Sequence, residues 1–202
     1  MLMRYPHVQI AILEELRALR LNAQNYFHVN HELASSNALP YTSAVFNETI
    51  RLFPPVPIEL KECTSQSTFP DGATLPVGAI VMWIPWSMGR SKTIWGEDAD
   101  SFKPERWLMK GANGNLSLMS KPAFEFPVFN GGPRSCLGKK MAESLAISVI
   151  ASLIWNFEFM SPDDGGTGNI ERRSQNSLTL PMEGGLPSRI KIRGKEKPAT
   201  FF

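Results

Sequence analysis

Phe129-Asn130-Gly131-Gly132-Pro133-Arg134-Ser135-Cys136-Leu137-Gly138 is the stretch that decides the fold of this chain. It places one thiol in a glycine-bordered loop, close to a phenylalanine and an arginine and just before an apolar helical segment. The thiolate form of cysteine is the metal ligand, and the free N–H groups and positive dipole at a helix start favour negative charge. The stretch therefore predicts that Cys136 is a thiolate ligand of a haem iron.

The other fixed positions of the loop suit the same cofactor. Gly132 and Gly138 remove side-chain bulk where a flat macrocycle approaches the backbone. Arg134 offers a guanidinium that can grip a haem propionate, which is a carboxylate. Phe129 can pack beneath the ligand and keep water away from the sulfur. The candidate cofactor-binding residues are thus Cys136, Phe129, Gly132, Arg134 and Gly138.

A cysteine such as Cys136 has two other common roles. A free cysteine is often a small buried core residue, and a cysteine can also bind zinc. The only other cysteine is Cys63, so no C-x-x-C pair exists to build a tetrahedral zinc site. Two cysteines also argue against a disulfide scaffold and fit a reducing compartment. We interpret Cys63 as structural.

A second constellation lies upstream, within a helix predicted over residues 39–53. Pro40 suits the first position of a helix and Pro54 ends it. Glu48 and Arg51 are three residues apart, so they lie on the same helix face. Taken alone, this pair would be an ordinary exposed ion pair worth a few tenths of a kcal/mol.

A third motif is Pro104-Glu105-Arg106-Trp107. The three patterns, in this order along the chain, resemble the hallmarks of the cytochrome P-450 family: Glu-x-x-Arg, Pro-Glu-Arg-Trp and Phe-x-x-Gly-x-Arg-x-Cys-x-Gly. The resemblance implies that Glu48, Arg51 and Arg106 form a buried triad behind the haem. Because removing one member strands the other charges, we expect a locking role in folding and haem retention.

The resemblance covers nearly the whole chain and implies its fold. We expect an α+β, mainly helical fold, namely the C-terminal half of the cytochrome P-450 fold with its J, K and L helices, short β-sheets, meander and Cys loop. The chain would form one partial domain over residues 1–202: the J and K helix region at 1–55, strands and meander at 56–128, and the haem-thiolate loop, L helix and C-terminal strands at 129–202. The expected long helices are 5–20, 39–53 and 137–157, with a short helix at 87–95 and strands at 79–83, 177–180 and 188–193.

The same resemblance implies a function, that of a haem-thiolate monooxygenase. Haem b would bind through Cys136 as the axial ligand of the iron, with dioxygen as co-substrate. A thiolate ligand favours cleavage of the O–O bond. Electrons would come from NADPH indirectly, through a flavoprotein reductase. Lys139 and Lys140 follow the loop and suit steering of an acidic reductase, although a solvated helix start explains them equally well.

Within the family, one branch fits best. Pro70-Asp71-Gly72, Ser87-Met88-Gly89-Arg90 and Ile94-Trp95-Gly96-Glu97-Asp98 are similar to the corresponding segments of eukaryotic fatty-acid omega-hydroxylases. This implies a lipid or other small hydrophobic substrate with a long acyl chain.

Four residues are candidates for lining the substrate side of the haem: Val56, Ile58, Leu178 and Thr179. Ordinary strand packing is the alternative for each of them. The sequence also departs from the family where many relatives carry a propionate-binding arginine a few residues after the Pro-Pro-Val-Pro segment. Lys61 is the nearest cation here, and it would act as a point charge without arginine's bidentate fork.

Complete members of the family are far longer than 202 residues. The resemblance implies that the I helix, which delivers protons to bound oxygen, lies outside this chain. We therefore expect a fragment or truncated product that alone binds haem poorly and turns over no substrate. One alternative is a non-catalytic product that binds haem or a partner weakly, and another is a reductase-independent peroxygenase or isomerase.

Some features exclude other classes of protein or location. No apolar run approaches the roughly 18 residues of a membrane span, so we expect no membrane anchor in this chain. For the intact enzyme, the resemblance implies a location on the cytosolic face of the endoplasmic reticulum membrane. A net charge of +2 is too mild to indicate nucleic-acid binding. His28 and His31 have no further ligands nearby in the sequence and are interpreted as a loop, and residues 163–169 as a flexible connection.

Overall fold

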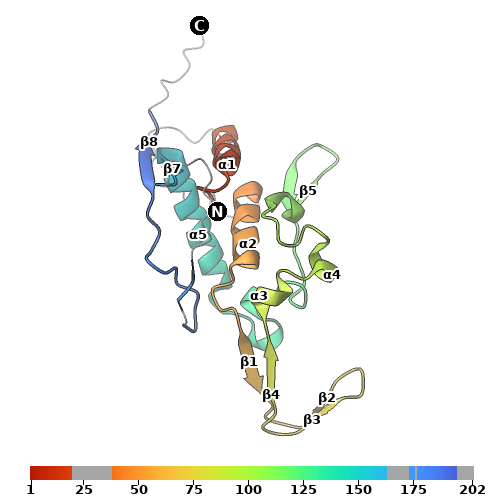
Figure 1. The fold of residues 1–202 in the computed structure, drawn as a ribbon. Coiled ribbons are helices and arrows are strands. Elements are labelled where there is room, and N and C mark those ends of the chain that lie inside the picture. The colour runs from red at the N-terminus through yellow and green to blue at the C-terminus, as the bar shows by residue number, and fades with distance from the viewer. Residues whose placement is uncertain (20–37, 163–172, 176, 195–202) are drawn as a thin grey trace.

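The computed structural model describes residues 1–19, 38–162, 173–175 and 177–194. Three helices form its centre: α1 (Pro6–Ala18), α2 (Pro40–Leu52) and α5 (Lys139–Asn156). They pack on one another side by side, and α2 also contacts the segment that carries the shorter elements (Figure 1). This helix therefore links the two sides of the molecule.

The shorter elements are four antiparallel two-stranded sheets and several single-turn helices within the described residues. The sheets are β1 (Glu59–Glu62) with β4 (Ile80–Trp83), β2 (Ser67–Thr68) with β3 (Thr74–Leu75), β5 (Leu108–Lys110) with β6 (Leu116–Leu118), and β7 (Phe157–Met160) with β8 (Arg189–Ile192). The short helices are α3 (Pro85–Met88), α4 (Lys92–Trp95), η1 (Pro104–Trp107), η2 (Pro127–Phe129) and η3 (Gly132–Arg134). The mixture of helices and small sheets agrees with the predicted α+β class.

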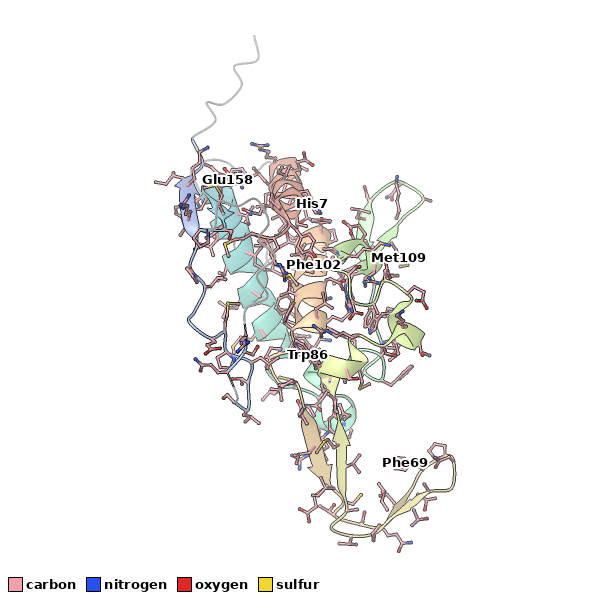
Figure 2. The ribbon with its side chains drawn as sticks, in the orientation of Figure 1. His7, Phe69, Trp86, Phe102, Met109 and Glu158 are labelled. Carbon is pink, nitrogen blue, oxygen red and sulfur yellow. The ribbon has the colours of Figure 1, made fainter. Side chains whose placement is uncertain are left out.

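The main core lies between α1, α2 and α5. Its buried members recur at helical spacing on each helix, as Val8, Ile12 and Leu16 do on α1. The full cluster is Val8, Ile12, Leu13, Leu16, Leu39, Val45, Leu52, Phe102, Ile147, Ala151 and Ile154. Phe102 comes from the loop after α4 and lies near α1 and α2 in Figure 2, whereas Phe69 lies on the distant β2–β3 hairpin.

The amide of Gln9 ties α1 to the last part of the chain. Its Nε2 donates to the carbonyl oxygens of Leu2 at 2.9 Å and Phe159 at 2.8 Å, and its Oε1 accepts the Phe159 N–H at 3.1 Å. The side chain therefore pairs with the backbone of β7 as a neighbouring strand would.

Glu15 caps the start of α2. Its Oε1 accepts the Tyr41 N–H at 2.6 Å, and its Oε2 accepts the Thr42 N–H at 2.9 Å and the Thr42 hydroxyl at 2.7 Å. These N–H groups have no partner inside the helix. Burial raises the pKa of Glu15, and the hydrogen bonds from Thr42 and Tyr41 oppose that rise.

The structure corrects the prediction of a strand at residues 177–180. Residues 177–179 form bends instead, inside a loop closed by a single bridge between Ser174 and Met182. The Leu180 N–H donates to the carbonyl of Pro55 at 3.0 Å, so it is used to dock the loop rather than to form a ladder. The strand predicted at 188–193 is confirmed as β8.

Other boundaries differ from the prediction in smaller ways. The last long helix ends at Asn156, and Phe157 begins β7, because the Arg193 side chain caps the helix by donating to Ile154 O at 2.9 Å and Phe157 O at 3.1 Å. The short helix expected at 87–95 is divided into α3 and α4. The β5–β6 hairpin was not predicted. His28, His31 and residues 163–169 lie outside the described residues, as does the end predicted at residue 20 for the first helix.

Candidate functional site

Cys136 lies in a loop built from η2 and η3. The loop is closed by the Cys136 N–H, which donates to the Phe129 carbonyl at 2.8 Å. Two residues between them adopt left-handed backbone conformations, Asn130 with φ 58° and Gly132 with φ 65°. Such turns bring the backbone back on itself and favour glycine or asparagine. Cys136 is an exposed free cysteine, so it is not the buried core residue of the first alternative.

The surface beside the sulfur is apolar and open. A Cβ on Gly138 would lie 3.9 Å from Cys136 Sγ. Met141 and Leu145 are four residues apart on α5, which places them on one face of that helix. Leu137 lies just before the helix, and all three side chains are exposed. An accessible thiol beside exposed aliphatic side chains, with the exposed Arg134 in the same loop, matches what a flat, apolar haem with charged propionates requires. These residues fit that group.

Asn130 connects the loop to the β1–β4 sheet. Its Nδ2 lies 3.5 Å from Oε1 of Glu59, the first residue of β1, which makes a long hydrogen bond. Its Oδ1 is buried and accepts no hydrogen bond from the residues that the structure describes. Asn130 was not among the predicted site residues. Its backbone lies in the left-handed region, with φ 58°, and this conformation helps to turn the loop.

The structure brings Glu48, Arg51 and Arg106 together. Arg51 forms a bidentate pair with Glu48, with Nε 2.7 Å from Oε2 and Nη2 2.7 Å from Oε1. Arg106 Nε donates to Oε1 of the same carboxylate at 3.0 Å. Glu48 and Arg51 are 0% exposed and the Arg106 side chain is 10% exposed. The exposed ion pair that the Glu48–Arg51 spacing alone would suggest is therefore excluded.

Sequence reasoning missed two further donors to Glu48. The Lys103 backbone N–H donates to Oε1 at 2.8 Å, and the Trp107 indole Nε1 donates to Oε2 at 2.9 Å. A backbone donor leaves no signal in a sequence. Trp107 did leave one, because it lies in the same tetrapeptide as Arg106 and a buried tryptophan usually needs a partner for its N–H.

The Arg51 guanidinium is also fully engaged on its other side. It donates to the carbonyl oxygens of Gly89, of Ala99 at 2.6 Å and of Ser101 at 3.0 Å. Its Cζ lies 5.0 Å from the centre of the Trp95 ring. A buried charge is tolerated when each of its donors has a partner, and Arg51 satisfies this condition.

The four candidate substrate-lining residues lie on two segments that touch. The hydrogen bond from Leu180 N–H to Pro55 O places the loop with Leu178 and Thr179 against the segment with Val56 and Ile58. Ile58, Leu178 and Thr179 are exposed and Val56 is half-buried. The alternative of ordinary strand packing does not apply to Leu178 and Thr179, because they lie in bends.

Lys61 and Lys139, the two lysines considered for roles beside the haem, have different neighbours. The Lys61 ammonium lies 5.3 Å from the centre of the Trp83 ring in the adjacent strand. Lys139 lies 5.6 Å from the centre of the Phe129 ring and 3.9 Å from Glu143 Oε1. Burial raises the pKa of the Glu143 carboxyl, with Lys139 opposing the rise.

Two features are absent from the part of the chain that the structure describes. It contains no cluster of three or more His, Cys, Asp or Glu side chains able to hold a metal ion. None of its helices has the length and apolar character needed to cross a bilayer.

Comparison with known proteins gives one family. The family model described as Cytochrome P450 matches residues 1–187. Cytochrome P450 CYP94D108 of Paris polyphylla is 37% identical over 186 residues, which cover 92% of this chain and 36% of that protein. Cytochrome P450 94A1 of Vicia sativa is 37% identical over 154 residues, covering 76% and 29%. Noroxomaritidine synthase of Narcissus aff. pseudonarcissus MK-2014 is 33% identical over 192 residues, covering 93% and 36%. The chain spans about a third of the length of these curated relatives.

Proposed function

The chain belongs to the cytochrome P450 family, and on that premise we propose that it is the haem-binding part of a haem-thiolate monooxygenase. The observation that carries the proposal is the exposed thiol of Cys136, held in a loop closed by the Phe129 carbonyl and bordered by exposed aliphatic side chains of α5. In this proposal the chain corresponds to the C-terminal half of the family's fold.

Five residues would hold haem b: Cys136, Phe129, Gly132, Arg134 and Gly138. When bound, the haem supplies an iron at which dioxygen is activated. Cys136 ligates through its thiolate, and Arg134 pairs with a propionate. Phe129 shields the sulfur from water. Gly132 and Gly138 leave room for the macrocycle, which is supported by the 3.9 Å that would separate a Cβ on Gly138 from the sulfur.

Glu48, Arg51 and Arg106 serve the site without chemistry of their own. Their buried network joins α2 to the segment from Gly89 to Trp107 through hydrogen bonds that span 38 to 59 residues of sequence. We assign it the role of holding the structure behind the haem, since an incomplete buried network costs several kcal/mol.

The proposed substrate is a fatty acid or similar long-chain lipid. Support comes from the segments that are similar to fatty-acid omega-hydroxylases and from the contact between the two candidate substrate-lining segments. Exposed apolar side chains such as Ile58 and Leu178 suit an acyl chain. We further propose that an NADPH-dependent flavoprotein reductase supplies electrons, with dioxygen as co-substrate, at the cytosolic face of the endoplasmic reticulum.

The test is the absorption spectrum of the reduced carbon-monoxide complex after reconstitution of the full chain with haemin. Because we expect the chain alone to bind haem weakly, the spectrum is recorded at excess haemin and compared over the fraction of chains that binds it. In that fraction the wild type and the matched control Cys63→Ser should give the thiolate-type spectrum, and Cys136→Ser should lose it. Survival of that spectrum in Cys136→Ser, or its absence from the wild type, would overturn the proposal.

A further inference from the structure

We propose that Trp107 is a positioning residue for the Cys136 loop. Its hydrogen bond to the buried Glu48 carboxylate would fix the orientation of the indole ring. The indole ring would in turn hold Phe126, and with it the loop, in place. The inference rests on the proposed haem-thiolate function, because it assigns Trp107 to the geometry of the thiolate ligand.

The first step is the uneven distribution of donors on Glu48. Oε1 accepts three hydrogen bonds, from Arg51 Nη2, the Lys103 N–H and Arg106 Nε. Oε2 accepts two, from Arg51 Nε at 2.7 Å and Trp107 Nε1 at 2.9 Å. Among the residues that the structure describes, the indole N–H is therefore one of two donors to Oε2. Hydrogen bonds to a charged acceptor are stronger than neutral ones, so this contact fixes one edge of the indole.

The second step is the packing of the Trp107 ring. The Trp107 and Phe126 rings meet edge to face, with their centroids 4.8 Å apart and their planes at 65°. Trp107 is 1% exposed, and Phe126 packs against the cluster that also contains Trp95, Ala44 and Ala99. A ring held at one edge by a charge and buried elsewhere has little freedom to tilt.

The third step leads from Phe126 to the thiol. Phe126 is the residue immediately before η2, which runs from Pro127 to Phe129. The Phe129 carbonyl then accepts the Cys136 N–H at 2.8 Å. A shift of Phe126 would displace the acceptor that closes the loop, because the proline and the tight turn between them leave few rotatable bonds.

The variants separate hydrogen bonding from packing. Trp107→Phe keeps an aromatic ring and removes the N–H to Glu48. Trp95→Phe is the matched control: Trp95 belongs to the same cluster, but its Nε1 donates to the Met88 carbonyl at 3.1 Å and not to Glu48. Phe126→Leu leaves Glu48 and its donors in place and removes the ring-to-ring contact.

The first measurement is amide hydrogen exchange of the Cys136 N–H by NMR on the full chain. Trp107→Phe and Phe126→Leu should each accelerate this exchange about fivefold, which corresponds to the loss of about one hydrogen bond of 1 kcal/mol. Trp95→Phe should change it by less than about twofold. If Trp107→Phe fails to fold, the result for Phe126→Leu decides the proposal. In that variant, slow exchange of the Trp107 indole N–H shows that its hydrogen bond to Glu48 is intact.

The second measurement is the share of the reduced carbon-monoxide complex in the thiolate form after haemin reconstitution. It should fall in Trp107→Phe and stay at the wild-type level in Trp95→Phe. Unchanged exchange of the Cys136 N–H in Trp107→Phe and Phe126→Leu would overturn the inference, and so would equal acceleration by Trp95→Phe, which would indicate general destabilisation. Loss of the thiolate-type spectrum in the wild type would instead overturn the proposed function, so the two failures are distinguishable.

Discussion

Arg51 and Gly89 touch each other twice. The Arg51 guanidinium donates to the Gly89 carbonyl, and the Arg51 carbonyl lies so close to the Gly89 Cα that any Cβ there would overlap it. The end of α2 and the end of α3 are therefore in backbone contact, and the contact requires a residue without a side chain.

Gly89→Ala should destabilise the fold by about 3 kcal/mol, because the backbone must move apart and weaken the hydrogen bonds of the buried guanidinium. The free energy of unfolding in urea measures this. Gly194→Ala is the matched control, since a Cβ at Gly194 meets nothing within 4 Å. Equal stability of the two variants would show that the approach of Arg51 to Gly89 is not required.

Arg51→Lys should cost about 3–5 kcal/mol, because a lysine cannot reproduce the bidentate pair with Glu48 or the bonds to three carbonyls. Its urea midpoint should fall well below that of Arg173→Lys, a substitution at an exposed position that should remain within about 0.5 kcal/mol of wild type. A loss of less than about 1 kcal/mol in Arg51→Lys would contradict the network described above.

Much of this fold was predictable because its signals are local. Pro40 and Pro54 bracket α2, and the helical spacing of Val8, Ile12 and Leu16 identifies α1. Turn formers around Gly72 and Gly78, both with positive φ, separate the short strands. These rules depend on a few neighbouring residues, so a sequence without structure is sufficient to apply them.

The features that the sequence did not predict depend on contacts between residues far apart in the chain. The end of α5 at Asn156 follows from capping by Arg193, and the loop at 177–180 is shaped by docking on Pro55. At the candidate site, the motif identified Glu48 and Arg106 as partners, but the backbone donor of Lys103 emerges only when the chain has folded. Local pattern carries no information about such pairings.

Gln9→Leu should destabilise the protein by about 2–4 kcal/mol. The substitution removes the partner of both the N–H and the C=O of Phe159 and replaces the amide by an apolar side chain of similar size, and unpaired backbone groups shielded from water carry a desolvation cost. Urea unfolding provides the measurement, with Gln66→Leu at an exposed loop position as the control. Similar midpoints for the two variants would argue that the bonds between Gln9 and Phe159 do not contribute.

Glu15 should make stability depend on pH. Burial raises its pKa in the folded protein above its value in the unfolded chain, so the folded state binds the proton more tightly. Stability due to Glu15 is therefore lost as pH rises through the interval between those two values. The free energy of unfolding of wild type relative to Glu15→Gln should fall as pH rises above the ordinary carboxyl pKa of about 4.3.

Comparison with Glu15→Gln cancels the other titrating groups, including Asp98, whose pKa is lowered by hydrogen bonds from Lys103 and Arg106. Urea unfolding at several pH values gives the difference directly. A difference that is constant, or that grows in favour of wild type as pH rises, would be incompatible with a raised pKa at Glu15.

The pair of hydrogen bonds between Gln9 and Phe159 also has a consequence for synthesis on the ribosome. The two residues are 150 positions apart, and translation at about 5–20 residues per second needs about 8–30 s to cover that distance. During this interval α1 exists without the strand that completes its surroundings, and its apolar face has no α5 to cover it. Codon choice between these two positions therefore sets how long that exposure lasts during synthesis.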